Sequence, residues 1–214
     1  MMWRSSRTIA HGPSRSYRTT KRAMDVVGGA ALMLLTFPIV AVFAAAIKLE
    51  DGGALIHRRR VLGVAGQEFD AFKLRTMRED ADAWLAARGD LSATYSANVK
   101  LLNDPRVTRT GRVARRFSVD ELPQLMNVVR GQMSLVGPRM IHPSELPRYG
   151  TFGAERMTVK PGLTGLWQVS GRQSLKYDLR VQLDREYVRQ QSLSTDLRIL
   201  IKTIPAVFGG RGAH

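Results

Sequence analysis

The sequence has no cysteine in its 214 residues, which excludes disulfide bonds and thiolate metal sites. Its four histidines, at positions 11, 57, 142 and 214, lack the spacing of zinc ligands, so a structural zinc site is not expected. Acidic residues are scarce: 18 Asp and Glu stand against 33 Lys and Arg, and the net charge is +15. This excess predicts a polyanionic partner, either nucleic acid, an acidic membrane or a phosphorylated ligand.

Charge is absent altogether from residues 26–47, an apolar run long enough to form a transmembrane helix. The run is too long for the apolar part of a signal peptide, and no separate Ala-x-Ala cleavage site stands beyond it. Residues 1–22 contain Lys and Arg but no acid, which favours the cytoplasm for that end by the positive-inside rule. Lys48 and the three arginines at 58–60 favour the cytoplasm for the other end as well.

Pro38 explains how both ends of this run can lie on the cytoplasmic side. A proline in mid-helix removes a backbone hydrogen bond and kinks the helix, while Thr36 can bond a carbonyl that is left free. The run can then enter and leave the membrane by one face, as a re-entrant helix. An ordinary span with a tolerated proline and a buried core helix are the two alternatives.

Residues 54–77 predict a β-hairpin, because two segments with strand-like patterns are joined through Gly63 and Gly66. In the second segment Lys73 and Arg75 are two residues apart, so their side chains are expected on the same face of a strand, where both could reach one anionic ligand. The alternative is that both are solvated at a sheet edge.

Residues 78–88 predict a surface helix, and the polar, aperiodic residues 89–103 predict a mobile loop. Arginines then cluster at positions 106, 109, 112, 115 and 116. For Arg106 and Arg109 we favour a solvated or lipid-facing position. Arg115 and Arg116 adjoin two acids, and for them we favour a role in binding a ligand.

Asp120 and Glu121 are those adjacent acids. One interpretation is structural, because Ser118 and Glu121 have the Ser-x-x-Glu spacing of a capping box at the start of a helix running to Val129. The other is chemical, because a helix N-terminus keeps a carboxylate ionised and neighbouring arginines can hold a phosphate for it to attack. The two interpretations are geometrically compatible.

Two rigid turns follow this segment. Gly137-Pro138-Arg139 presents a guanidinium, and a second turn lies at residues 160–165. The glycines of the second turn and of the residues after it lack the spacing of a dinucleotide fingerprint or a Walker loop.

The C-terminal region, from Leu193 to Phe208, has apolar residues at three- and four-residue intervals, opposite Arg198 and Lys202. This pattern predicts an amphipathic helix. The helix can pack on the core or lie on lipid, and the sequence leaves both options open.

These motifs together resemble the bacterial sugar transferase family, the monotopic phosphoglycosyl transferases that begin exopolysaccharide, capsule, O-antigen and glycoprotein glycan assembly. The resemblance covers nearly everything after residue 20. It rests on residues 21–25, the apolar run with its proline, and residues 72–77, 103–108, 118–124, 131–139, 159–168 and 196–197. Several long motifs in the same order make chance agreement improbable.

The resemblance implies transfer of sugar 1-phosphate from a nucleotide sugar, usually a UDP-sugar, to polyprenyl (undecaprenyl) phosphate, with release of UMP. Asp120 matches the family's nucleophile, which would form a covalent aspartyl phosphosugar before the lipid phosphate takes that group. Glu121 matches the second acid of the dyad. The two acids would position Mg²⁺, whose charge offsets the repulsion between a carboxylate and a diphosphate.

The same motifs imply the other site residues. Arg115 falls at the family's phosphate-binding arginine before the acid pair. The remaining implied residues are Lys73, Arg75, Arg139 and Arg172 as ligands of the diphosphate or nucleotide, Pro138 and Gln168 as parts of the nucleotide pocket, and Asp184. For Asp184 a site role and a structural ion pair both stay open.

The sequence departs from the family pattern in two places. Arg60 stands where the family often has an acid, and Met140 follows Gly-Pro-Arg where the family often has a second proline. These departures bear on sugar or nucleotide specificity. They leave the acid pair and the membrane anchor unchanged.

With the resemblance, the predicted fold is α+β and mostly helical. A basic tail (1–22) precedes a re-entrant membrane helix (23–48) broken at Pro38, and a catalytic domain (49–214) follows with a small β-hairpin and interfacial amphipathic helices. The expected partners are a nucleotide sugar, polyprenyl phosphate and membrane lipids, with no nucleic acid, and a homodimer is an open option. The expected location is the cytoplasmic face of the bacterial inner membrane.

Two other functions remain as alternatives. A membrane-anchored basic binding protein would dock lipid or nucleic acid through its arginines, while Asp120 and Glu121 only capped a helix. A hydrolase would form the same aspartyl phosphate and use water as the acceptor. Transfer is favoured because it uses the anchor, the acid pair and the arginine-bearing turns together.

Overall fold

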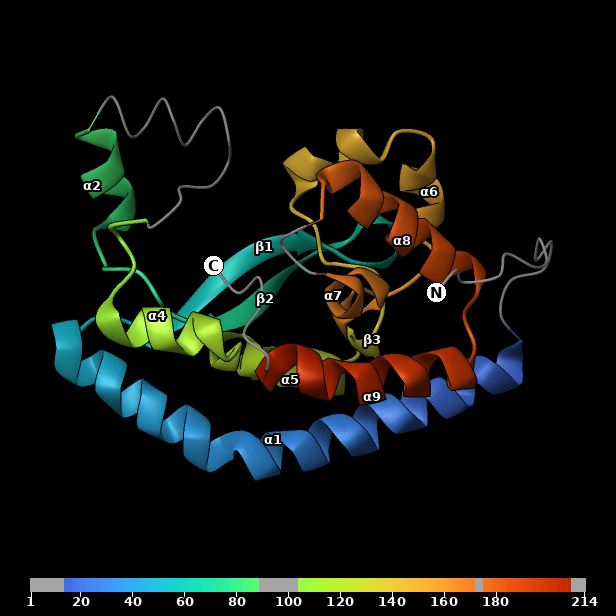
Figure 1. The fold of residues 1–214 in the computed structure, drawn as a ribbon, viewed down its shortest axis with the longest axis horizontal. Helices are drawn as coiled ribbons and strands as arrows, with labels where there is room; N and C mark the ends of the chain where they lie inside the picture. Colours follow the sequence, from blue (N-terminus) through green and yellow to red (C-terminus); the bar gives the residue numbers. More distant parts are fainter. Residues whose placement is uncertain (1–13, 89–103, 172–174, 209–214) are drawn as a thin grey trace.

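The computed structural model describes residues 14–88, 104–171 and 175–208. One long helix, α1 (Arg15–Asp51), runs along one side of a body made of shorter helices and two small sheets (Figure 1). The predicted α+β, mostly helical class is confirmed. Within the described ranges, α1 is the one helix that is long and apolar enough to cross a membrane.

Helix α1 is longer than the predicted range 23–48, and Pro38 lies inside it without breaking it. The expected break is therefore wrong, although Figure 1 shows the helix bent near its middle. Pro38 has no N–H to donate to the carbonyl of Leu34, whereas the Thr36 hydroxyl donates to the carbonyl of Leu32 at 2.7 Å. Thr36 thus supports the turn before the proline rather than the carbonyl that the proline frees.

The start of α1 is bonded to distant parts of the chain. Tyr17 Oη and Lys21 Nζ both donate to Oδ2 of Asp196, at 3.0 and 2.8 Å. One turn later Asp25 is buried, and its carboxylate accepts the backbone N–H of Leu135 at 2.9 Å. These contacts hold the first turns of α1 against the body.

The end of α1 is bonded to the same body. The Glu50 carboxylate accepts the backbone N–H groups of Arg109 and Thr110, at 2.8 and 3.2 Å, at the start of α4 (Arg109–Arg116). It therefore caps α4 from a neighbouring helix. Asp51 forms an ion pair with Arg75, just beyond the hairpin.

Between these two attachments, α1 is largely exposed and apolar. Its exposed large apolar side chains are Val27, Leu32, Leu34, Leu35, Phe37, Ile39, Val42 and Leu49. An apolar surface of this length is unfavourable in water and favours a lipid environment.

The predicted hairpin is confirmed. Strands β1 (Ile56–Leu62) and β2 (Glu68–Leu74) pair antiparallel, with Ile56 opposite Leu74 and Leu62 opposite Glu68. A short 3₁₀ helix, η1 (Val64–Gly66), joins them, and Gly66 adopts φ 73° there, a conformation that glycine reaches without strain. Phe69 and Ala71 face the core from alternate positions of β2.

The other elements are shorter than α1. In chain order they are α2 (Ala81–Ala86), α4, the 3₁₀ helix η2 (Val119–Gln124), α5 (Leu125–Arg130), β3 (Ser134–Val136), the 3₁₀ helix η3 (Pro143–Tyr149), α6 (Phe152–Arg156), β4 (Gly162–Thr164), α7 (Leu166–Ser170), α8 (Tyr177–Arg189) and α9 (Leu193–Phe208). Strands β3 and β4 pair in parallel. The helix predicted at 78–88 is reduced to α2, and the loop predicted at 89–103 lies outside the described residues.

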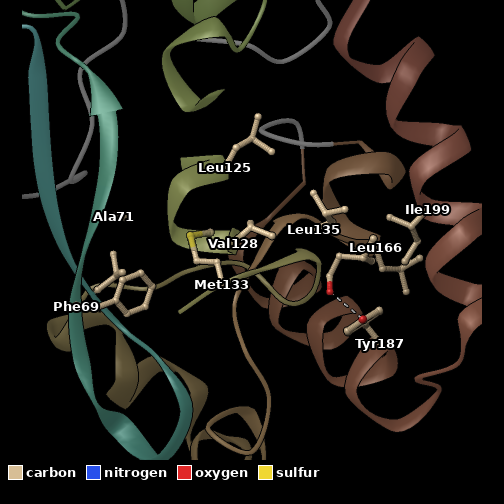
Figure 2. Packing of buried hydrophobic residues seen from close by; sticks show 11 residues of the cluster. Phe69, Ala71, Leu125, Val128, Met133, Leu135, Leu166, Tyr187 and Ile199 are labelled. Carbon is tan, nitrogen blue, oxygen red and sulfur yellow. Dashed lines mark hydrogen bonds between the residues drawn. The ribbon is translucent and has the colours of Figure 1, made fainter. Parts of the chain in front are cut away.

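The main hydrophobic core joins the hairpin to the C-terminal helices (Figure 2). It contains Phe69 and Ala71 of β2, Leu125 and Val128 of α5, Leu135 of β3, Leu166 of α7, Tyr187 of α8 and Ile199 of α9. The Tyr187 hydroxyl lies 3.0 Å from the carbonyl of Val136 and 2.7 Å from Asp196. Because the hairpin and α5 share this core, the end of β2 is fixed next to the segment that leads into α5.

Two further helices expose apolar side chains. Leu193, Leu197, Ile201 and Ile204 are exposed on α9, and Val113 and Phe117 are exposed on or just after α4. Figure 1 shows α4, α5 and α9 in a row beside α1. The amphipathic helix predicted at the C-terminus is confirmed as α9.

Candidate active site

The Asp120 carboxylate lies at the centre of the candidate site. Asp120 is 3% exposed, and its Oδ2 lies 2.9 Å from Nζ of Lys73, at the end of β2. Oε1 of Glu121 lies 3.4 Å from the same ammonium, and the Glu121 side chain is 39% exposed. One lysine therefore bridges the two acids, and it points to them rather than into solvent.

Lys73 is charged in this position. Burial disfavours its ammonium form, but the carboxylates of Glu121 and Asp120 outweigh burial, and the pKa of Lys73 is raised. Lys73 is therefore protonated at neutral pH and supplies positive charge beside Asp120.

The backbone around the acid pair differs from the prediction. Ser118 has φ 56°, in the left-handed region, and its side chain makes no capping hydrogen bond. The expected capping box is therefore wrong, and a 3₁₀ helix, η2, precedes α5 in place of one continuous α-helix. The two acids are consecutive in η2 and so diverge, with Asp120 directed inward and Glu121 toward solvent.

Arg115 approaches the site from α4. Its Nε donates to Oγ1 of Thr76 at 2.9 Å. Helix α4 can come this close because residue 111 is glycine: a Cβ there would lie 2.1 Å from the Thr76 carbonyl oxygen. Burial lowers the pKa of Arg115, and the charge of Asp120 opposes that shift. The guanidinium remains charged and lies within the field of the acid.

A carboxylate beside an ammonium and a guanidinium suits chemistry at phosphorus. The two cations can bind phosphoryl oxygens and offset their charge as it grows during attack. The carboxylate can act as the nucleophile and form an acyl phosphate.

The acid pair also fits a magnesium ion. Mg²⁺ commonly binds one or two protein carboxylates together with substrate phosphates, and Asp120 and Glu121 already share one cationic partner in Lys73. In the part of the chain that the structure describes, no group of three or more His, Asp or Glu residues is arranged to hold a metal. The donors present therefore fit an ion shared with a substrate phosphate rather than a complete protein cage.

Two predicted ligands have other surroundings. The Arg75 guanidinium pairs with Asp51 and donates to the carbonyls of Ala54 (2.5 Å) and Met77 (3.0 Å), so it fastens the end of α1 to the hairpin. The expectation that Arg75 and Lys73 point into one site is wrong, because Asp51 at the end of α1 holds the Arg75 guanidinium, whereas Lys73 contacts Asp120 and Glu121. Arg116 is exposed, with its guanidinium 5.7 Å from the Phe117 ring.

The remaining predicted residues gather after β3. Pro138 is buried, and its carbonyl accepts the N–H of Gly162 at 2.9 Å. The Arg139 guanidinium lies 5.4 Å from the centre of the Trp167 ring, and Gln168 follows in α7 with a buried Oε1. Arg172 lies outside the described residues.

Asp184, on α8, supports this second cluster. Its Oδ1 accepts the backbone N–H of Arg139 at 3.1 Å, and its Oδ2 accepts the hydroxyl of Tyr149 at 2.9 Å. Burial raises the pKa of Asp184 to about 6, and the charge of Arg156 and the bond from Arg139 oppose the shift. These contacts are those of a residue that positions the main chain of Arg139.

Sequence reasoning missed Thr76 and Glu50, which position Arg115 and the start of α4. Their roles depend on the approach of α4 to the hairpin and to α1, which no local spacing encodes. Gly111 offered one signal, because a glycine inside a helical arginine-rich segment indicates a close backbone approach.

Fold and site together combine a long exposed apolar helix, consistent with membrane association, with a carboxylate and cations suited to phosphoryl transfer. Residues 16–210 match the family profile described as bacterial sugar transferase. The exopolysaccharide production protein ExoY of Rhizobium meliloti is 43% identical over 198 residues, which cover 91% of this chain and 88% of that protein. The chain belongs to the bacterial sugar transferase family, so the resemblance is confirmed.

Two other relatives carry names that state an activity. The UDP-glucose:undecaprenyl-phosphate glucose-1-phosphate transferase of Caulobacter vibrioides is 40% identical, over 91% of this chain and 72% of that protein. The undecaprenyl-phosphate galactose phosphotransferase of Salmonella typhimurium is also 40% identical, over 94% of this chain but 43% of that longer protein.

Proposed function

We propose that this protein transfers sugar 1-phosphate from a UDP-sugar to undecaprenyl phosphate and releases UMP, as the first membrane step in the assembly of an exopolysaccharide, capsule or related glycan. The observation that carries the proposal is the buried Asp120 carboxylate paired with Lys73, with the charge of Arg115 acting on it, on a body fastened to a long apolar helix. The names of the relatives support the donor and acceptor classes.

In the first half-reaction, Asp120 attacks the phosphorus that bears the sugar. A bond forms between a carboxylate oxygen and that phosphorus, and the bond from phosphorus to the bridging oxygen breaks, so UMP leaves with that oxygen and its electron pair. Because Lys73 contacts Oδ2 of Asp120, we assign the attack to Oδ1. Lys73 and Arg115 offset the charge on the phosphoryl oxygens.

In the second half-reaction, an oxygen of undecaprenyl phosphate attacks the same phosphorus. The bond from Asp120 to phosphorus breaks, the carboxylate is restored, and undecaprenyl diphosphosugar leaves. The same two cations serve both steps, because each step develops negative charge on the same phosphoryl group.

We further propose that Asp120 and Glu121 hold Mg²⁺ together with the donor phosphates. When bound, the ion supplies positive charge that offsets the repulsion between a carboxylate and a diphosphate. Glu121 suits this task because its carboxylate is partly exposed to solvent and therefore accessible to an ion that arrives with the donor.

The attachments of α1 support a re-entrant topology. Its start is bonded to Asp196 and Leu135, and its end is bonded to Arg75 and α4, so both ends lie on one body. A helix that crossed the bilayer would have to break one set of these bonds. The exposed apolar middle of α1 would then enter the membrane and return by the same face.

The exposed apolar side chains of α4 and α9 support an interfacial position for the body. Leu197, Ile201 and Ile204 would enter the lipid beside α1, and Val113 and Phe117 would do so from α4. The excess of positive charge would attract acidic lipids. We therefore propose the cytoplasmic face of the bacterial inner membrane as the location.

Labelling of single cysteines tests the topology. Cysteines introduced near residue 10 and near residue 90 have no native thiol to compete with. A re-entrant helix predicts that an impermeant reagent labels both positions from the same side of the membrane. Labelling from opposite sides would overturn the re-entrant topology.

Covalent trapping tests the chemistry. Full-length protein with Mg²⁺ and a panel of radiolabelled UDP-sugars should form an adduct with one of them, and Asp120→Asn should form none. Asp178→Asn, which changes an exposed acid of α8, is the matched control and should retain the adduct. A basic binding protein would form no adduct in any variant, and a hydrolase would release sugar phosphate at a rate that undecaprenyl phosphate does not change.

A further inference from the structure

The Trp167 ring has two guanidinium groups against it. The Arg139 guanidinium lies 5.4 Å from the ring centre, and that of Arg180, on α8, lies 5.3 Å from it. Both distances are within the range of cation–π contacts. Trp167 is 5% exposed, so the ring is a fixed platform that brings two positive charges together.

Helix α8 sets this arrangement through two residues one turn apart. Asp184 accepts the backbone N–H of Arg139, and Arg180 lies four residues earlier on the same face of α8. The Arg180 Nε donates to the carbonyl of Leu175 at 3.0 Å, and Arg156 Nη2 donates to the carbonyl of Arg139 at 2.6 Å. The backbone of Arg139 and the base of the Arg180 side chain are thus held independently of any ligand.

Two guanidinium groups flank the Trp167 ring, and another lies near the start of α8. A third guanidinium, that of Arg148, lies 5.2 Å from the Tyr177 ring, at the start of α8. Glu145, the acid on the same short helix as Arg148, already pairs with Arg59 at 3.2 Å. Burial lowers the pKa of Arg180, and the charge of Arg139 lowers it further, while the charge of Glu145 opposes the shift. Like charges held this close favour an anionic ligand with more than one charge.

Buried polar atoms without a protein partner lie in the same elements. They are Nε1 of Trp167 and Oε1 of Gln168 in α7, and the hydroxyl of Tyr177 in α8. Buried donors and acceptors of this kind are normally bonded to protein, water or ligand. Together they offer a donor, an acceptor and a group that can be either.

We infer that Arg180, which lies against the same Trp167 ring as Arg139, binds a phosphate of the nucleotide part of the donor. The inference rests on the proposed function and adds Arg180 to its substrate-binding residues. A soluble nucleotide fits better than the lipid phosphate, because Figure 1 shows α8 on the side of the body away from α1. Arginine suits this ligand, since its planar fork donates two parallel hydrogen bonds to one phosphate.

Binding of UDP to the full-length protein, measured by calorimetry in detergent, tests the inference. Arg180→Gln should weaken UDP binding roughly 10-fold or more, as expected for the loss of a charged hydrogen-bonding partner. Arg185→Gln is the matched control: it removes the same charge from an exposed position of α8, where the guanidinium lies 5.9 Å from the Phe152 ring. The control should bind UDP as the wild type does.

Steady-state kinetics separate the donor from the acceptor. Arg180→Gln should raise the KM for the UDP-sugar and leave the KM for undecaprenyl phosphate unchanged. A raised acceptor KM with an unchanged donor KM would overturn the inference. If Arg180→Gln does not fold, Arg180→Lys keeps the charge and loses the fork, and it should still bind UDP severalfold more weakly than wild type.

The outcomes also separate this inference from the proposed function. Equal UDP affinity in wild type, Arg180→Gln and Arg185→Gln would overturn the role of Arg180 while UMP release continued to support transfer. A wild-type protein that neither bound UDP nor released UMP from any UDP-sugar would overturn both.

Discussion

Asp120 and Asp184 are both buried carboxylates near arginines, yet they are bonded in different ways. Asp120 meets the ammonium of Lys73 at 2.9 Å, a side-chain partner that can exchange for a ligand. Asp184 accepts a backbone N–H from Arg139 and the hydroxyl of the buried Tyr149. A partner in the main chain cannot be exchanged without moving the fold. Asp120 is therefore available for chemistry, whereas Asp184 positions other groups.

The pKa shifts at the two sites support the same distinction between Asp120 and Asp184. Glu121 and Asp120 raise the pKa of Lys73 despite its burial, so the first site keeps a cation beside its acids. Burial raises the pKa of Asp184 to about 6, so the second site makes its own acid easier to protonate. A nucleophile has to be ionised at the working pH, and the raised pKa of Asp184 works against that requirement.

The largest expected effect is on turnover, through Lys73. Lys73→Met should lower kcat by roughly 100- to 1000-fold, because it removes the charge that offsets the phosphoryl oxygens beside Asp120. Arg58→Met, which removes an exposed charge from β1, is the control and should retain near-normal turnover. The measurement is UMP release with saturating donor and acceptor. A kcat within threefold of wild type would remove Lys73 from the site.

The next effect is on stability, through Asp184. Asp184→Ala should lower the free energy of unfolding by about 3 kcal/mol, because it leaves the Arg139 N–H and the Tyr149 hydroxyl without their acceptor in a buried place. Asp178→Ala on the exposed side of α8 should change it little. Denaturant unfolding in detergent measures both. Equal stability of the two variants would contradict the positioning role of Asp184.

A smaller effect is expected on the pH dependence of stability, through the carboxyl group of Asp184. Because the pKa of Asp184 is raised to about 6 in the folded protein, the folded state binds more protons than the unfolded state between about pH 4 and pH 6. Stability from this group therefore falls as pH rises through the folded pKa, by about 1 kcal/mol between pH 5 and pH 7. Asp184→Asn should lack this component. Identical pH profiles for wild type and Asp184→Asn would show that Asp184 titrates normally.

The smallest effect concerns the turn before Asp120. Ser118→Gly should raise the free energy of unfolding by about 0.5 kcal/mol, because glycine reaches the left-handed conformation at Ser118 more easily than serine. A serine that capped the helix would instead lose stability on this change. Thermal unfolding of the two proteins distinguishes these signs.

Much of the fold and site could be predicted because the signals are local. Alternation gave the hairpin, three- and four-residue intervals gave α9, and an unbroken apolar run gave the middle of α1. The adjacent acids Asp120 and Glu121 and the arginine before them stand in one short segment. Such patterns depend on backbone periodicity and neighbouring residues, which a sequence displays directly.

The errors lie where distant segments decide the outcome. The spacing predicts that Ser118 caps a helix, but Ser118 adopts the left-handed conformation at the start of η2, which packs against β2. Arg75 was expected beside Lys73, but Asp51 at the end of α1 pairs with it. Pro38 was expected to break a helix that in the structure continues through it. Each depends on contacts that spacing along the chain does not specify.

The order of the residues alone establishes a basic protein with one apolar helix, an acid pair behind arginines and the motifs of one family. Those features follow from composition and from short-range order. The folded arrangement of distant segments places Lys73 between the two acids, rests both ends of α1 on one body and brings Asp184 to the main chain of Arg139. The physical reason is that a buried charge takes whichever partner the packing of distant elements places within hydrogen-bond reach.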